Sequence, residues 1–343
     1  MKLMLSVFRG VAAPLWAITF VVALMSTAVA QPVKISGGLT AGGDVSTAYA
    51  ISPDGAFAVF VADKDTDGKN ELYSVRFSTG VITNISAGLV TGGNVINFQI
   101  SPDSARVVFV ADKDTDQVFD LYSTPIASGA PIKLSGPLVT GGTVDFSFQI
   151  SPDSARVVFV ADKETDQVFE LYSTPIASGL PIKLSGPLVT GGTVEFSFQI
   201  SPDSARVVFS ASKDTAAVFE LYSTPIASGA PIKLSGPLVS GGTVQSGFQI
   251  SADSARVVFL ADKLFVQVVE LFRVQIAGAA LALDFDGDDR VLPLTDALLL
   301  ARYQLGLRGS ALISNAVGVN ATRTSAAAIE AFIQKSLLTP ALP

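Results

Sequence analysis

The chain has 343 residues, a formal net charge of -7, and neither histidine nor cysteine. The acidic balance argues against a cationic surface for phosphates, so we expect no nucleic-acid partner. The absence of histidine and cysteine excludes a Ser-His-Asp triad, thiol nucleophiles, disulfides and metals held by histidine or cysteine.

Residues 1–30 have the pattern of a signal peptide. Lys2 and Arg9 provide a basic start before an apolar stretch over residues 11–25, and Ala28-Val29-Ala30 is typical of a cleavage site. The apolar stretch is shorter than the roughly twenty residues of a membrane-spanning helix. We therefore expect cleavage after Ala30 and a secreted or periplasmic protein without a membrane span, a retained anchor being the alternative.

Residues 31–280 contain a repeat with a period of about fifty residues. The phrase Ser-Pro-Asp-Ser-Ala-Arg-Val-Val-Phe begins at Ser101, Ser151 and Ser201, and a form with Ala in place of Pro begins at Ser251. An earlier form, Ser-Pro-Asp-Gly, begins at Ser52. A fixed period of this length with strand patterns is typical of stacked units such as propeller blades.

Each period predicts four strands, which in one copy cover residues 144–150, 156–161, 168–174 and 182–185. The first alternates apolar and polar residues, and the second is an apolar run that fits a strand buried on both faces. Four antiparallel strands per unit form one blade. The sequence thus predicts an all-β fold, a five-bladed β-propeller of four-stranded blades.

The ends of the repeat region suggest how the ring closes. Residues 33–36 are similar to the fourth strand at 132–135, whereas the fifth copy loses its pattern after Ile276. An N-terminal strand that completes the last blade would close the ring and predicts a monomer. Residues 281–283 are the alternative fourth strand. An open array, or assembly between chains, is a further alternative.

The repeats resemble the TolB-like, or PD40, β-propeller family. The matching stretches are residues 52–60 with Glu71-Leu72-Tyr73, residues 101–109 with Asp120-Leu121-Tyr122, and their copies. The sequence departs from the family pattern where Gly55 becomes serine in the later copies and where Ala252 replaces proline. The resemblance implies a binding platform, because no hydrolase domain accompanies the repeats.

The first copy has an acidic turn in which Asp63, Asp65 and Asp67 precede Gly68, with Glu71 beyond them. Alternating carboxylates before a glycine are typical of a calcium loop. A solvated hairpin is the alternative, and the later copies favour it because they lack the glycine.

Residues 281–343 differ in character and predict a small helical module with a calcium loop. Helices are expected over residues 297–305 and after Thr324 or Ser325. The segment resembles a dockerin or EF-hand-like module, and this resemblance implies the following calcium ligands: Asp284, Asp286, Asp288, Arg290 through its carbonyl, and Asp296. An acidic linker that caps a helix is the alternative.

The near-identity of the copies bears on function. Residues 101–150 and 151–200 differ at only four positions. Equivalent surfaces favour binding or scaffolding over an active site, which needs different groups at one point. We expect no catalytic residues and a protein or polysaccharide partner. A carboxylate-dependent glycan enzyme using Asp145 and Glu195 is one alternative, and a purely structural repeat is another.

Overall fold

The computed structural model describes residues 31–228, 230–276, 285, 286, 294–318, 321 and 323–338. The expected signal peptide, residues 1–30, lies outside this part. The chain divides into two compact units, residues 1–35 and 36–343, and all the elements below belong to the second. Within the described residues, no helix has the length and apolar character needed to cross a membrane.

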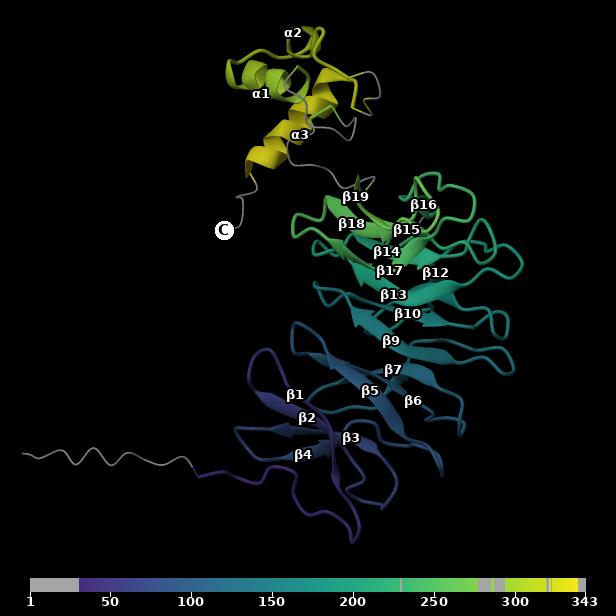
Figure 1. Ribbon diagram of the computed structural model, residues 1–343. Coiled ribbons are helices and arrows are strands. Elements are labelled where there is room, and N and C mark those ends of the chain that lie inside the picture. The colour runs from purple at the N-terminus through teal and green to yellow at the C-terminus, as the bar shows by residue number, and fades with distance from the viewer. Residues whose placement is uncertain are drawn as a thin grey trace, which may run out of the picture. The chain divides into compact units, whose positions relative to one another are not determined.

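Antiparallel strands dominate the described chain and form five sheets, each built in chain order (Figure 1). The first sheet contains β1 (Val45–Ile51), β2 (Phe57–Ala62), β3 (Glu71–Arg76) and β4 (Ile82–Asn84). The second contains β5 (Val95–Ile100), β6 (Arg106–Ala111), β7 (Asp120–Pro125) and β8 (Ile132–Lys133). The third contains β9 (Val144–Ile150), β10 (Arg156–Ala161), β11 (Glu170–Pro175) and β12 (Ile182–Lys183). The fourth contains β13 (Val194–Ile200), β14 (Arg206–Ala211), β15 (Glu220–Pro225) and β16 (Ile232–Lys233), and the fifth β17 (Val244–Ile250), β18 (Arg256–Ala261) and β19 (Glu270–Gln275).

The repeated phrase forms a tight turn before the second strand of each sheet. In the third sheet the Ser151 hydroxyl donates to Asp153 Oδ1 at 2.5 Å, and the Ala155 N–H donates to the same oxygen at 3.0 Å. The apolar run that follows becomes β10, in which every residue after Arg156 is buried. The predicted strand with two buried faces is therefore confirmed.

The third strand of each sheet starts later than the sequence indicated. Val168 was expected to begin it, but its N–H donates to the Thr165 carbonyl at 3.0 Å and so belongs to the preceding turn. The strand begins at Glu170, and the fourth strand is only two residues long. Among the described residues, the first four sheets have four strands each and the fifth has three.

Neighbouring sheets share apolar layers. Between the second and third sheets, Val108, Val110 and Leu121 pack in one buried cluster with Val157 and Phe159. Equivalent clusters join the other consecutive sheets. We call this repeated contact the junction.

Two polar bonds recur at the junctions. The Asp103 N–H donates to the Ser154 hydroxyl of the next sheet at 3.0 Å, and Gln149 Nε2 donates to the Phe198 carbonyl at 2.7 Å. Each sheet thus depends on its neighbour both for apolar burial and for polar bonding, as in other repeat proteins.

Closure of the ring is not confirmed. Val258, Leu260 and Leu271 of the fifth sheet are 37%, 40% and 69% exposed, whereas their counterparts in the second sheet are fully buried. Residues 33–36 form no strand, and Val33 is 80% exposed. The alternative closing strand, residues 281–283, lies outside the described residues.

In the part of the chain that the structure describes, the sheets are followed by the helices α1 (Asp296–Gln304), α2 (Ser310–Ile313) and α3 (Ala326–Leu338). They share a small core, whose buried members are Phe285, Leu299, Leu312, Ala316, Ile329 and Ile333. The sequence anticipated α1 and α3 but not α2. α3 starts just after Ser325, whose hydroxyl accepts the Ala328 N–H at 3.3 Å.

Candidate functional site

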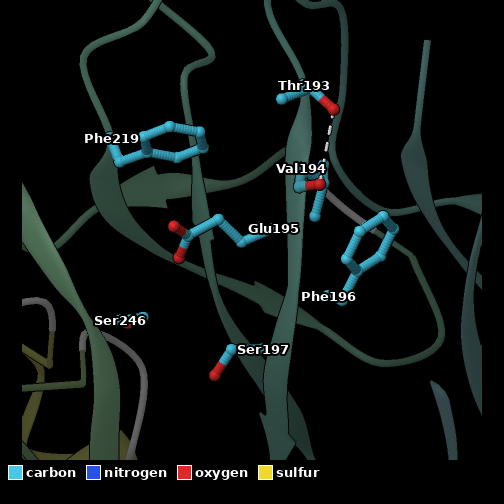
Figure 2. A pocket seen from close by; sticks show the side chains of 7 residues that line it. All are labelled: Thr193, Val194, Glu195, Phe196, Ser197, Phe219 and Ser246. Carbon is cyan, nitrogen blue, oxygen red and sulfur yellow. Dashed lines mark hydrogen bonds between the residues drawn. The ribbon is translucent and has the colours of Figure 1, made fainter. Parts of the chain in front are cut away.

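A cavity of about 410 Å³ opens beside β13, next to Phe219 in the loop before β15 and Ser246 in β17. Figure 2 shows its lining, which consists of Thr193, Val194, Glu195, Phe196, Ser197, Phe219 and Ser246. We call it the Glu195 pocket. Its walls are two phenylalanine rings, and its polar groups are three hydroxyls and one carboxylate.

A strand irregularity creates this pocket. The pairing register between β13 and β14 shifts between Val194 and Phe198, which face the core. Residues 195–197 lie within this bulge, where a strand bends and re-aims its side chains. In Figure 2 the carboxylate of Glu195 lies on the side of β13 that faces Phe219, and the Phe196 ring lies on the opposite side of the strand.

The carboxylate of Glu195 is incompletely satisfied. Its Oε2 atom is buried and makes no hydrogen bond with the described residues. A buried acceptor without a donor costs free energy, more so when it is charged. A ligand that supplies a donor at this oxygen would recover that cost.

The same pocket occurs one repeat earlier. A cavity of about 380 Å³ is lined by Gln117, Phe119, Gly141, Thr143, Val144, Asp145, Phe146 and Phe169. Asp145 here takes the place of Glu195, so we call it the Asp145 pocket. The ring pairs Phe119–Phe146 and Phe169–Phe196 meet edge to face with centroids 5.2 Å apart in both cases. Phe146 and Phe196 are 45% and 49% exposed, which places a repeated aromatic surface beside each carboxylate.

The carboxylates proposed for the enzyme alternative line two different pockets. Asp145 lines one of these pockets and Glu195 the other. Gln245, the counterpart in the fifth sheet, lines neither of them. Carboxylate catalysis of glycoside cleavage requires two acids flanking one bond, which these two pockets do not provide.

In each of the second, third and fourth sheets, a lysine on the fourth strand lies between two carboxylates and holds that strand to its own sheet. Sequence reasoning missed this feature. In the third sheet Lys183 Nζ lies 2.6 Å from Glu164 and 2.7 Å from Glu170. Burial lowers the pKa of Lys183, but hydrogen bonds to both carboxylates outweigh it and raise that pKa above the ordinary value. The matching triads are Asp114, Lys133 and Asp120, and Asp214, Lys233 and Glu220.

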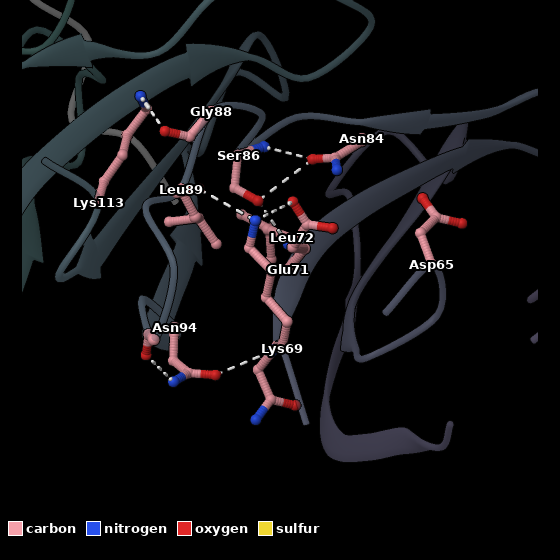
Figure 3. Close-up of polar contacts among 12 residues, drawn as sticks. Asp65, Lys69, Glu71, Leu72, Asn84, Ser86, Gly88, Leu89, Asn94 and Lys113 are labelled. Carbon is pink, nitrogen blue, oxygen red and sulfur yellow. Dashed lines mark hydrogen bonds and ion pairs between the residues drawn. The ribbon is translucent and has the colours of Figure 1, made fainter. Parts of the chain in front are cut away.

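The first sheet has no lysine on its fourth strand and pairs its buried carboxylate with another lysine (Figure 3). Asn84 stands where the other fourth strands have lysine, and Glu71 instead lies 3.9 Å from Lys69 Nζ. Lys69 also donates to the Leu89 carbonyl at 3.0 Å. The recurring Lys-Leu-Ser and Glu-Leu-Tyr phrases were the signal that could have revealed these pairs.

The acidic turn of the first sheet binds its own backbone. Asp63 accepts the N–H groups of Asp44 and Gly68, and Asp65 accepts the Tyr73 hydroxyl at 3.0 Å. These bonds lower the pKa of Asp63. Across the described residues, no three acidic side chains gather as a metal site. The geometry favours the hairpin interpretation of this turn.

Two of the five expected calcium ligands are described, and both are fully buried. Asp296 Oδ1 accepts the Phe285 N–H at 2.6 Å, and Asp286 Oδ2 accepts the Gly318 N–H at 2.5 Å. Asp284, Asp288 and Arg290 lie outside the described residues. The calcium loop remains a prediction.

The five sheets and their repeated pockets define the class as a repeat protein of β-propeller type. Residues 23–173 match the family model described as the lipoprotein LpqB beta-propeller domain. This match covers less than half of the chain and reaches into the third sheet. No curated protein matches the sequence.

Solved structures are similar to parts of the chain at low identity. A putative TolB from Agrobacterium tumefaciens is 20% identical, with a TM-score of 0.40 over 67% of this chain and 76% of that one. Dipeptidyl peptidase 4 from Porphyromonas gingivalis is 12% identical, with a TM-score of 0.50 over 65% of this chain and 37% of that one. The chain thus spans little more than a third of the peptidase.

Proposed function

We propose that the chain is an exported, non-catalytic binding protein that holds a protein ligand through the Glu195 and Asp145 pockets. The observation that carries the proposal is the recurrence of one pocket, with a carboxylate between phenylalanine rings, in consecutive repeats. Equivalent sites along a chain favour a ligand that engages several of them at once, because linked sites raise the effective concentration.

The pocket chemistry favours basic side chains of the ligand. Lysine and arginine carry an apolar stem that packs on rings such as Phe196 and a charged head that donates hydrogen bonds. The buried Oε2 atom of Glu195 lacks such a donor among the described residues. The net charge of -7 also attracts a cationic partner over longer distances.

The probe for this function is a lysine-rich peptide with interspersed leucines, measured by calorimetry against a neutral oligosaccharide. We expect peptide binding that weakens about tenfold in Glu195→Gln, because a charge-assisted hydrogen bond contributes roughly 1.5–3 kcal/mol. Gln245→Ala changes a polar residue outside both pockets and serves as the control. Tight binding of the oligosaccharide, or equal peptide binding by Glu195→Gln, would contradict the proposal.

Export is part of the proposal. The signal-peptide pattern of residues 1–30 and the similarity to a lipoprotein β-propeller domain support a periplasmic or extracellular location.

The C-terminal module is proposed to bind calcium. Asp286 and Asp296 are buried close together, and the Asp286 N–H donates to Asp296 Oδ1 at 3.4 Å. Carboxylates are the oxygen ligands that calcium prefers, and buried charge is stabilised by a cation. Asp284, Asp288 and the Arg290 carbonyl would complete the set.

Calcium at millimolar concentration should therefore raise the melting temperature of the chain. Asp288→Ala should abolish the increase without altering the melting temperature in chelator, since only the metal-bound state loses a ligand. Asp116→Ala, an exposed acid of the second sheet, is the control. The absence of both a heat of binding and a thermal shift would rule out the site.

A further inference from the structure

We infer that the fifth sheet receives the first sheet and residues 33–36 of a second copy of this chain, so that copies associate head to tail. This inference goes beyond the proposed function and rests on the junction that joins consecutive sheets. One half of a junction is exposed on the fifth sheet, and the other half is exposed at the start of the chain.

The outer face of the fifth sheet is the first half. Val258, Leu260 and Leu271 occupy the positions of Val108, Val110 and Leu121, which the next sheet buries completely. A terminal repeat that meets only solvent normally has a polar outer face. This face keeps the apolar chemistry of an internal junction, so it is built to be covered.

Among the described residues, no fourth strand pairs with β19 and no cation lies beside its carboxylate. Glu270 holds the position of Asp120, Glu170 and Glu220, each of which lies 2.7 Å from a fourth-strand lysine. Glu270 Oε2 is buried and has no hydrogen-bond partner among the described residues. Of the five sheets, the fifth alone has no described lysine within 4.0 Å of this carboxylate.

Residues 33–36 carry the missing group. Their sequence, Val-Lys-Ile-Ser, aligns with Ile-Lys-Leu-Ser at 132–135, so Lys34 corresponds to Lys133 and Ser36 to Ser135. In the second sheet the Ser135 hydroxyl donates to Asp120 at 2.7 Å, next to the lysine. Lys34 and Ser36 of a second copy would supply the same two donors to Glu270.

β1, the strand that follows residues 33–36, also exposes the apolar residues that an internal junction would bury. On β1, Val45 and Tyr49 are 40% and 74% exposed, while the matching Val144 and Phe148 of β9 are 1% and 3% exposed. Gln249 on the fifth sheet is exposed, whereas the equivalent Gln199 donates to the Phe248 carbonyl at 2.5 Å. The Tyr49 carbonyl of a second copy is the corresponding acceptor.

One bond of the internal junctions is missing from this contact. At the internal junctions, the aspartate N–H of one sheet donates to a serine hydroxyl of the next, as Asp103 does to Ser154. The first sheet has Gly55 in place of that serine. The intermolecular junction is therefore weaker than the internal ones, which suits reversible association. Both halves of the junction contain exposed apolar residues, and a second copy can cover each of them.

The decisive experiment is sedimentation velocity over a concentration series, using the chain from Gln31. We expect species larger than one chain that increase with concentration, and loss of these species in Leu260→Asp. Leu264→Asp makes the same change at an exposed turn of the same sheet and should associate normally. Leu260 is already 40% exposed, so the melting temperature should be unchanged. A wild-type chain that sediments as a monomer at every concentration would overturn the inference.

Charge reversal tests the strand contact. Lys34→Glu and Glu270→Lys should each weaken association about tenfold, and the double variant should recover most of it, as expected for a close charge pair. A mixture of Leu260→Asp with Lys34→Glu should form dimers, because each partner keeps one intact half. Failure of the mixture to associate would contradict head-to-tail contact.

Restoring the missing hydroxyl offers a gain-of-function test. No atom lies within 4 Å of a Cβ built on Gly55, so Gly55→Ser meets no clash, and it would adopt a left-handed φ similar to that of Ser104. We expect association to become roughly fivefold tighter, in line with one hydrogen bond. Unchanged association in Gly55→Ser would contradict the proposed register.

Discussion

Serine at a left-handed backbone position marks each internal junction. Ser104, Ser154, Ser204 and Ser254 have φ between 59° and 62°, a region that favours glycine. The hydroxyls of these residues accept the aspartate N–H of the preceding sheet at 3.0 Å. The strain at this position is therefore offset by a bond that only a side chain can make.

Two substitutions at Ser154 separate the bond from the strain. Ser154→Ala should lower the free energy of unfolding by about 1–2 kcal/mol, because it removes the acceptor and keeps the Cβ. Ser154→Gly also removes the acceptor but relieves about 1–2 kcal/mol of left-handed strain, so it should be nearly neutral. Chemical denaturation of both variants checks this, and a larger loss in the glycine variant would contradict it.

In the second, third and fourth sheets, the fourth strand has only two residues and is too short to be held by its backbone alone. β12 has two residues and is fastened to β11 by Lys183, which bonds both Glu164 and Glu170. The sequence revealed the strands because their apolar pattern is local, and their boundaries were nearly correct. The lysine triads and the pockets depend on side chains from different strands meeting, which no single pattern displays.

Lys183→Met should lower the free energy of unfolding by about 1–3 kcal/mol, since the buried Glu170 loses its cation. Adding Glu170→Gln should recover part of the loss in a double-mutant cycle. The raised pKa of Lys183 means that the pair stabilises the fold below pH 10.5 and stops doing so as the pH rises through that pKa. A melting temperature in Lys183→Met equal to that of the wild type would contradict this role.

At the scale of the whole molecule, the repeat predicted sheets that follow one another in the chain, and the structure confirms them. Ring closure could not be read from the sequence, because residues 33–36 match a fourth strand in sequence without showing which sheet they join. The Glu195 pocket was also out of reach, since the bulge between Val194 and Phe198 leaves no mark in the alternation of β13.

The account holds that each sheet is stabilised by junctions with its immediate neighbours. Deleting residues 151–200 tests this directly, because the second and fourth sheets then meet through the same residues that now face the third. We predict a β-rich circular dichroism spectrum and a single cooperative melting transition at a lower temperature, since one repeat and one junction are lost. A deletion variant that fails to fold would contradict the account, because it would show that stability requires all five sheets together.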